Sequence, residues 1–230
     1  MGLLTVNGNP KTNKSISYGY LTGILHLAPA RVSRVMDTCK HKTAACETAC
    51  LNTAGRGGIG ELASNTVQLA RIRRTELLAK GLDLFFSKLI HDIGKLERQA
   101  NKLGLLPAVR LNGTSDIPWE RIKHEGKTIF EWFPGVMFYD YTKYPDRCID
   151  GINNYSLTFS RTESNDDLAI VKLNVGENVA VVFHTVPNVW NGFQVIDGDE
   201  HDLRFLDPRG VVVGLKAKGR AKKDISGFVI

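Results

Sequence analysis

The segment YSLTFS at residues 155–160 decides the fold, together with GVMFYDY at residues 135–141 and NVAVVF at residues 178–183. All three segments are short, rich in β-branched and aromatic residues, and bounded by polar residues, which is typical of buried strands. The sequence predicts a helix at Asp166–Asn174, between the segments at residues 155–160 and 178–183. Strands that alternate with helices favour a parallel sheet in an α/β fold.

More strands and helices are predicted on both sides of these segments. The chain has 230 residues, a length that suits one α/β barrel. We therefore expect a partial or closed parallel β/α barrel at residues 18–230, preceded by a loose leader at residues 1–17. The additional strands are predicted at residues 18–27, 108–112 and 211–215, and the additional helices at residues 61–80, 82–103 and 119–132.

Composition and charge narrow the class of protein. Hydrophobic residues make up 43% of the chain and charged residues 23%, so an ordinary globular core is expected. The net charge of +6 makes a nucleic acid a candidate partner, with residues 71–74 and 216–223 as its most basic stretches. No apolar run reaches the roughly 18 residues of a membrane span, and the first twenty residues lack a signal-peptide pattern. We expect a cytoplasmic protein with no membrane partner.

Three of the four cysteines lie close together in CKHKTAACETAC, residues 39–50. In a reducing compartment, clustered cysteines are more often metal ligands than disulfides. Cys39, Cys46 and Cys50 could bind three irons of a 4Fe-4S cluster and leave the fourth iron open to a ligand. Cys148 stands far from them and is interpreted as an ordinary packed thiol.

A zinc site is the alternative for the same cysteines. His41 lies between Cys39 and Cys46 and would complete a set of three cysteines and one histidine. His26 is a second candidate donor. The sequence alone does not distinguish an iron-sulfur cluster from a zinc ion at these cysteines.

A glycine-rich run, Gly55–Gly58, follows the cysteines directly. Backbone amides at Gly57 and Gly58 could approach the carboxylate of a bound cofactor, because glycine has no side chain to keep a ligand away. A tight turn before the following helix is the alternative interpretation.

Polar residues stand at the carboxyl ends of several predicted strands, where the active sites of α/β barrels lie. Parallel strands that are buried on both faces are usually apolar. These polar residues therefore indicate that the interior of the barrel holds a ligand or water. Loop caps and ion pairs are the alternative interpretation. The acidic turn at residues 197–202 is a further candidate for substrate contact or for a divalent metal. The predicted cofactor-contacting residues are Arg110, Asn112, Ser115, Asp116, Asp140, Ser160, Arg161, Glu163 and Asp199.

Several long segments resemble one family of phage proteins. They include ACLNTAGRGG, VRLNGTSDIPWE, NYSLTFSRTESN and the closing DISGFVI. On these segments the chain resembles the phage proteins named after mycobacteriophage gene product 88. The resemblance implies an α/β barrel distantly similar to radical S-adenosylmethionine enzymes, cluster ligation by Cys39, Cys46 and Cys50, and expression inside a bacterial cell.

These inferences lead to two functional hypotheses. The first is a phage-encoded iron-sulfur enzyme that binds S-adenosylmethionine and modifies a nucleotide or another small anionic substrate by radical chemistry, with an electron donor from the host. Lys143 and Arg110 would hold anionic groups, and Tyr141, or alternatively Tyr139, would relay a proton or hydrogen. The second is a zinc-stabilised, nucleic-acid-binding phage protein without catalysis.

Overall fold

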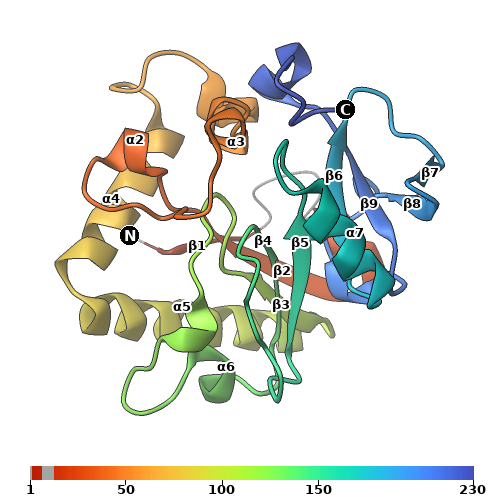
Figure 1. The fold of residues 1–230 in the computed structure, drawn as a ribbon. Coiled ribbons are helices and arrows are strands. Elements are labelled where there is room, and N and C mark those ends of the chain that lie inside the picture. Colours follow the sequence, from red (N-terminus) through yellow and green to blue (C-terminus); the bar gives the residue numbers. More distant parts are fainter. Residues whose placement is uncertain (1, 7–12) are drawn as a thin grey trace.

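The computed structural model describes residues 2–6 and 13–230 and has a mixed α/β architecture (Figure 1). The described strands form one sheet in the order β1-β2-β3-β4-β5-β6-β9-β8-β7. Their bounds are β1 (Leu4–Val6), β2 (Tyr20–Leu25), β3 (Leu106–Arg110), β4 (Met137–Thr142), β5 (Tyr155–Ser160), β6 (Val179–Phe183), β7 (Val189–Trp190), β8 (Phe193–Asp197) and β9 (Val212–Lys216).

The sheet is mostly parallel, as predicted. Strands β2 to β6 pair in parallel in their order along the chain, and β9 and β8 continue the parallel sheet beyond β6. Such a sequential order is that of a β/α barrel wall, because a doubly wound sheet reverses its strand order near the middle. The order nevertheless ends at β1 and β7, so pairing of the described strands does not close a barrel. A curved partial barrel therefore stays a prediction.

Helices pack on the sheet and connect its strands. The helical bounds are α2 (Ala30–Ser33), α3 (Ala44–Thr48), α4 (Thr66–Lys80), α5 (Leu82–Lys102), α6 (Ile129–Trp132) and α7 (Asp166–Asn174), and the short 3-10 turns are η1 (Ser15–Tyr18), η2 (Leu51–Thr53), η3 (Gly55–Gly58), η4 (Trp119–Arg121), η5 (Arg204–Leu206) and η6 (Gly219–Lys223). The predicted helices within 61–80, 82–103 and 166–174 are confirmed. No helix in the described part of the chain is both long and apolar enough to cross a membrane.

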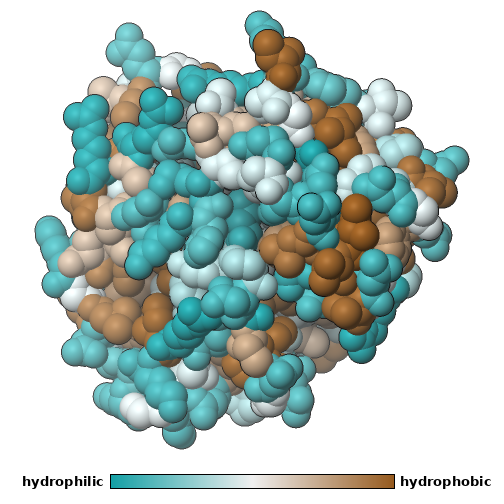
Figure 2. Space-filling model, viewed as in Figure 1, coloured by the Kyte–Doolittle hydropathy of each residue, from teal (hydrophilic) through white to brown (hydrophobic). Residues whose placement is uncertain are grey.

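The core beside the sheet contains two main apolar clusters. Helix α5 packs on β1, β2 and β3 and buries Phe85, Phe86 and Ile93 completely. A smaller apolar cluster joins Leu173 of α7 to Val179 of β6 and its neighbours. Figure 2 shows an apolar surface patch near α7, whereas hydrophilic side chains cover much of the face that carries α2 and α3. The face with these hydrophilic side chains is the one that carries the cysteine segment.

The predicted helix at residues 119–132 is wrong. Its two ends form only the turns η4 and α6, and a β-bridge joins His124 to Lys127 between them. Glu125 and Gly126 have φ angles of 51° and 79°. Positive φ angles are incompatible with a right-handed helix, so the chain turns at this point.

The predicted loose leader is wrong for the described residues 3–6. Leu4–Val6 pairs with β2 in antiparallel orientation, and Leu3 is fully buried. Residue 1 and residues 7–12, which belong to the same predicted leader, lie outside the described residues. The sheet therefore begins before the first strand that the sequence predicted.

The β7–β8 hairpin was also missed. Asn191 and Gly192 connect its two strands with φ angles of 47° and 85°. An Asn-Gly pair between apolar residues is a strong hairpin signal, because both residues tolerate positive φ. The sequence contains this signal in VWNGFQV, where the flanking strands are too short to stand out by their apolar pattern.

Candidate functional site

The cysteine segment lies at the carboxyl edge of the parallel sheet (Figure 1). Cys39 Sγ is 4.0 Å from the carbonyl oxygen of Thr114, which follows β3. The Thr43 hydroxyl donates a hydrogen bond of 2.9 Å to Glu163, which follows β5. These contacts bring residues that are distant in sequence to the same end of the sheet, as the barrel interpretation predicted.

Helix α3 packs against apolar residues near the C-terminus. Ala45, Ala49 and Cys46 pack in one cluster with Phe228 and Val229 near the C-terminus. Residue Val229 also forms a parallel bridge to Val182 of β6. The closing segment DISGFVI therefore lies between the sheet and the helix that carries Cys46.

Local backbone structure orients two of the cysteines. Thr43 is the N-cap of α3, and its hydroxyl accepts a hydrogen bond of 3.1 Å from the Cys46 amide. Cys50 is the N-cap of η2, and its sulfur accepts a weak contact of 3.5 Å from the Asn52 amide. Both sulfur-bearing residues thus stand at defined positions of short helical turns.

Lys143 follows β4 and faces all three cysteines. Burial alone would lower the pKa of Lys143, but the thiolate forms of Cys46, Cys39 and Cys50, together with the Asp116 carboxylate, outweigh burial and raise it. Lys143 is therefore a cation at neutral pH. Burial raises the pKa of Cys39 to about 12, although Lys143 opposes this shift. The pKa of Cys50 is also raised, again mainly by burial.

Arg71 of α4 places a second cation near the cysteine segment. Its side chain is buried, with the residue only 8% exposed, and its NH1 group donates to the Asn52 carbonyl at 2.8 Å and to Asn52 Oδ1 at 2.7 Å. Its Nε has no hydrogen-bond partner. Within the described part of the chain, only Cys50 and Arg74 alter the pKa of Arg71 electrostatically, so no carboxylate balances its charge. Arg71 belongs to the basic stretch 71–74, a candidate for nucleic-acid contact, and its burial removes this one side chain from the surface, whereas the nucleic-acid partner stays a prediction.

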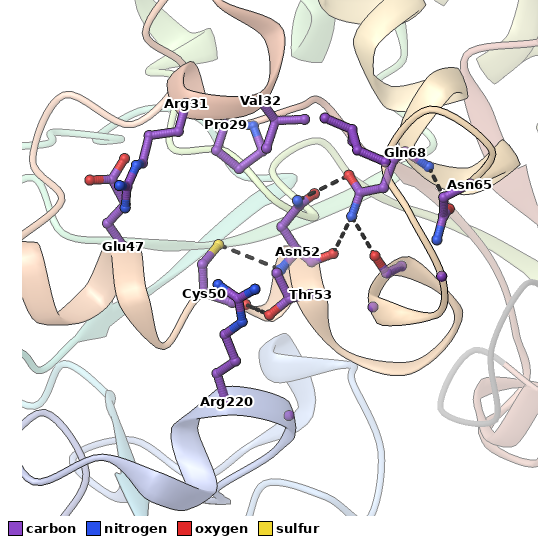
Figure 3. Close-up of a pocket in the computed structure, with 15 residues that line it drawn as sticks. Pro29, Arg31, Val32, Glu47, Cys50, Asn52, Thr53, Asn65, Gln68 and Arg220 are labelled. Carbon is purple, nitrogen blue, oxygen red and sulfur yellow. Dashed lines mark hydrogen bonds between the residues drawn. The ribbon is translucent and has the colours of Figure 1, made fainter.

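The glycine run is packed tightly against the cysteine segment (Figure 3). A Cβ atom on Gly57 would lie 2.5 Å from the Asn52 carbonyl oxygen, and one on Gly58 would lie 2.0 Å from that of Thr53. Gln68 donates hydrogen bonds to the carbonyl oxygens of both Asn52 and Gly57, at 2.8 and 2.6 Å. Close backbone packing thus explains both glycines, and their contact with a cofactor stays a prediction.

A second group of predicted site residues forms a buried network around Asp140 in β4. Asp140 accepts hydrogen bonds from the Asn112 amide (2.6 Å), the Asn112 side chain (3.1 Å) and the Tyr155 hydroxyl (2.9 Å). Arg147 donates to the same Tyr155 hydroxyl at 2.7 Å. Burial outweighs these donors and raises the pKa of Asp140 to about 7.

Ser115 and Asp116 belong to the same region. Ser115 donates to Asn112 Oδ1 at 2.9 Å, and Asp116 accepts the backbone amide of Lys143 at 2.7 Å. The structure therefore brings four predicted cofactor contacts together: Asn112, Ser115, Asp116 and Asp140. Their polar atoms already have protein partners, which favours the alternative interpretation as loop caps and ion pairs.

Arg110 and Tyr141 meet in a third group, on the interior side of the sheet. The Arg110 guanidinium lies 4.6 Å from the centroid of the Tyr141 ring, and its NH1 group is 3.0 Å from Asp202. Arg110 Nε has no hydrogen-bond partner. Tyr139 donates to Asp202 at 3.3 Å, and burial raises the pKa of Tyr141. The sequence placed Asp202 only in an acidic turn and missed its pairing with Arg110.

The remaining predicted contacts join loops to one another. Arg161 pairs with Asp166 and donates to the Phe228 carbonyl at 3.1 Å. Asp199 accepts the Lys216 amide at 3.1 Å and lies 2.5 Å from Lys218 Nζ. Ser160 is buried at the end of β5, where its carbonyl accepts a hydrogen bond of 3.3 Å from Asn165.

No group of three or more His, Cys, Asp or Glu side chains among the described residues is arranged to hold a metal ion directly. The four cysteines are free, and Cys148 is exposed, so its interpretation as a packed thiol is wrong. The His41 ring packs on Tyr144 with a centroid distance of 3.9 Å. Burial, with help from Arg71, lowers the pKa of His26 to about 3.

The fold and the site define a class: a mixed α/β protein with a mostly parallel sheet and three cysteines at its carboxyl edge. A family model described as Gene product 88 matches residues 3–230, and the chain therefore belongs to the gene product 88 family of phage proteins. The family expected from the sequence is thus confirmed. No curated protein and no solved structure matches the chain.

Proposed function

We propose that this chain is an iron-sulfur enzyme that holds a 4Fe-4S cluster on Cys39, Cys46 and Cys50 and modifies a nucleotide or another small anionic substrate with the help of S-adenosylmethionine. The observation that carries this proposal is the charge around the three cysteines. Lys143 interacts electrostatically with all three cysteines and Arg71 with Cys50, and Arg71 has no carboxylate partner in the described structure.

The charges favour thiolate ligands over free thiols. A buried cation without a counter-charge is costly, and neutral thiols supply no negative charge. Thiolates are the metal-binding form of cysteine, and adjacent cations stabilise them. Metal binding would therefore remove the burial penalty on Cys39 and Cys50 and would give Arg71 and Lys143 their counter-charge.

The donor set also distinguishes a cluster from a single ion. All donors of one zinc ion must lie within about 2.3 Å of the same point, whereas a cluster distributes its cysteines over separate irons. Three cysteines without an arranged single-ion site suit the wider assembly better. A cluster with one open iron would bind the amino and carboxyl groups of S-adenosylmethionine and supply the electron that breaks its carbon-sulfur bond.

The residues of the interior would bind the substrate. Arg110 stands on β3 with an unpartnered Nε and would hold an anionic group. Tyr141 lies against Arg110 and, with its raised pKa, keeps its proton at neutral pH, so its hydroxyl would serve as a donor. The sequential strand order supports the partial barrel that would enclose these groups.

Anaerobic purification with iron and sulfide analysis tests the proposal. We expect about four irons per chain, a brown colour, and release of 5′-deoxyadenosine when S-adenosylmethionine and a reductant are added. Cys46→Ala should lose both iron and turnover. Cys148→Ala is the matched control, since Cys148 is exposed and free, and it should keep both. A colourless protein with one zinc per chain, or full activity in Cys46→Ala, would refute the cluster.

A further inference from the structure

A cavity of about 530 Å³ opens beside the cysteine segment, on the side where Cys50 is accessible (Figure 3). Its walls come from five short elements, α2, α3, η2, η3 and η6, together with the first turn of α4. A cavity of this size is within the range of small-molecule sites and is large enough for a nucleotide.

Two arginines line the cavity from opposite elements. Arg31 comes from α2 and Arg220 from η6, and neither forms an ion pair among the described residues. Figure 3 shows the Arg220 side chain extending toward Cys50 and Thr53. Glu47 is the one acidic residue among those that line the cavity. The lining side chains thus carry a net positive charge.

Arg71 adds a third positive charge beneath the cavity floor. Its NH1 atom lies 3.0 Å from the position that a Cβ on Gly57 would occupy, and Gly57 is part of the lining. The residue is more than nine-tenths buried, and its Nε has no hydrogen-bond partner. An anion in the cavity would offset a buried charge that the described carboxylates do not balance.

The floor is held rigid before any ligand arrives. Asn52, Gln68 and Asn65 line the cavity. The Gln68 and Asn65 side chains donate to backbone carbonyls of Asn52 and of the glycine run, and the Asn52 side chain donates to Gln68 Oε1. Asn65 also accepts the Gln68 amide at 3.0 Å as the N-cap of α4. A pre-organised floor lowers the entropic cost of binding.

We infer that this cavity binds the phosphate group of a nucleotide, with Arg220 and Arg31 as the lining guanidinium groups that contact it. Guanidinium groups form paired hydrogen bonds to phosphate, and the buried Arg71 charge reinforces them. A free nucleotide and the backbone of a nucleic acid present the same phosphate chemistry. The inference does not depend on the proposed cluster, because each group that it uses belongs to the protein.

Binding to the metal-free protein tests this inference separately from the cluster. Titrations would use AMP and, in parallel, a short single-stranded DNA without a binding consensus, each at several salt concentrations. Arg220→Ala should weaken binding about tenfold, the effect of one lost charge-assisted contact. Arg31→Ala should act similarly. Lys222→Ala is the matched control, because Lys222 is an exposed cation of the same turn that does not line the cavity.

The two probes distinguish a free nucleotide from a nucleic acid as the source of the phosphate. Weaker binding of AMP by Arg220→Ala, with Lys222→Ala unchanged, supports a free nucleotide as the occupant. The same pattern with DNA alone, together with a steep salt dependence, supports a nucleic-acid phosphate. No binding of either probe at about 1 mM, or equal binding by Arg220→Ala and Lys222→Ala, overturns the inference.

Discussion

Two polar regions at the same edge of the sheet differ in how completely their charges are paired. In the Asp140 network, formed by Asp140, Asn112, Tyr155, Arg147 and Glu120, the carboxylates and the guanidinium have close protein partners. At the cysteine site, formed by Cys39, Cys46, Cys50, Lys143 and Arg71, a buried guanidinium lacks both a carboxylate among the described residues and a partner for its Nε.

This difference distinguishes residues with a structural role from residues with a functional role, although the residue types are similar. A satisfied buried network stabilises one conformation and offers a ligand little. At the cysteine site a buried cation without a carboxylate partner lies beside thiols whose pKa is raised by burial, so a metal-bound thiolate or an anion can still pair with this cation. Substitutions in the Asp140 network should therefore change stability, whereas substitutions at the cysteine site should change reactivity.

The largest expected effect is the loss of stability in Asp140→Ala. This change leaves the Tyr155 hydroxyl, the Asn112 backbone amide and the Asn112 side chain without their buried acceptor, and should cost about 3 kcal/mol in the free energy of unfolding. Urea denaturation followed by circular dichroism measures it. Asp150→Ala, at an exposed aspartate, should change stability by less than about 0.5 kcal/mol. A similar small change in Asp140→Ala would mean that the network does not hold the fold.

A smaller change, counted per pH unit, is expected in the pH dependence of stability. The pKa of Asp140 is about 7 in the folded protein, above the value of about 3.9 in an unfolded chain. The folded state then binds the proton more tightly, so the Asp140 contribution to the unfolding free energy decreases as pH rises from about 4 to 7. The decrease would reach at most about 1.4 kcal/mol per pH unit.

Asp140→Asn isolates this contribution because asparagine does not titrate. The stability of the natural protein minus that of Asp140→Asn should fall between pH 4 and pH 7. Taking the difference cancels the opposite contribution of His26, whose pKa is lowered and which favours folding as pH rises through the same range. A difference that stays constant or rises with pH would contradict the raised pKa of Asp140.

The sequence predicted the regular elements better than the site. The bounds of β5 and α7 agree with the prediction, because their apolar patterns are local. The break at Gly126 and the turn at Asn191 depend on positive φ angles, which the apolar pattern does not report.

Pairing within the site depends on tertiary structure. Arg110 meets Asp202 across 92 positions of sequence, and Thr43 meets Glu163 across 120. The residue types at the strand ends could be predicted as polar. Only the three-dimensional structure shows which of these polar groups have hydrogen-bond partners within the protein and which do not.

The smallest expected effect is a change in thiol reactivity without a loss of stability, in Lys143→Gln. The Lys143 charge lowers the pKa of Cys39 and of Cys50 against the burial that raises them. Removing this charge should shift the alkylation of both thiols to higher pH, because only the thiolate reacts.

Mass spectrometry of iodoacetamide-treated, metal-free protein over a pH series measures the shift at each cysteine. Lys40→Gln is the matched control, since Lys40 is an exposed lysine next to Cys39 and does not contribute to the shift of either thiol pKa. Cys148 provides an internal reference, because it is exposed and should react identically in all variants. Unchanged pH profiles in Lys143→Gln would mean that the Lys143 charge does not act on these cysteines, and Arg71 would remain as a described cation that acts on Cys50.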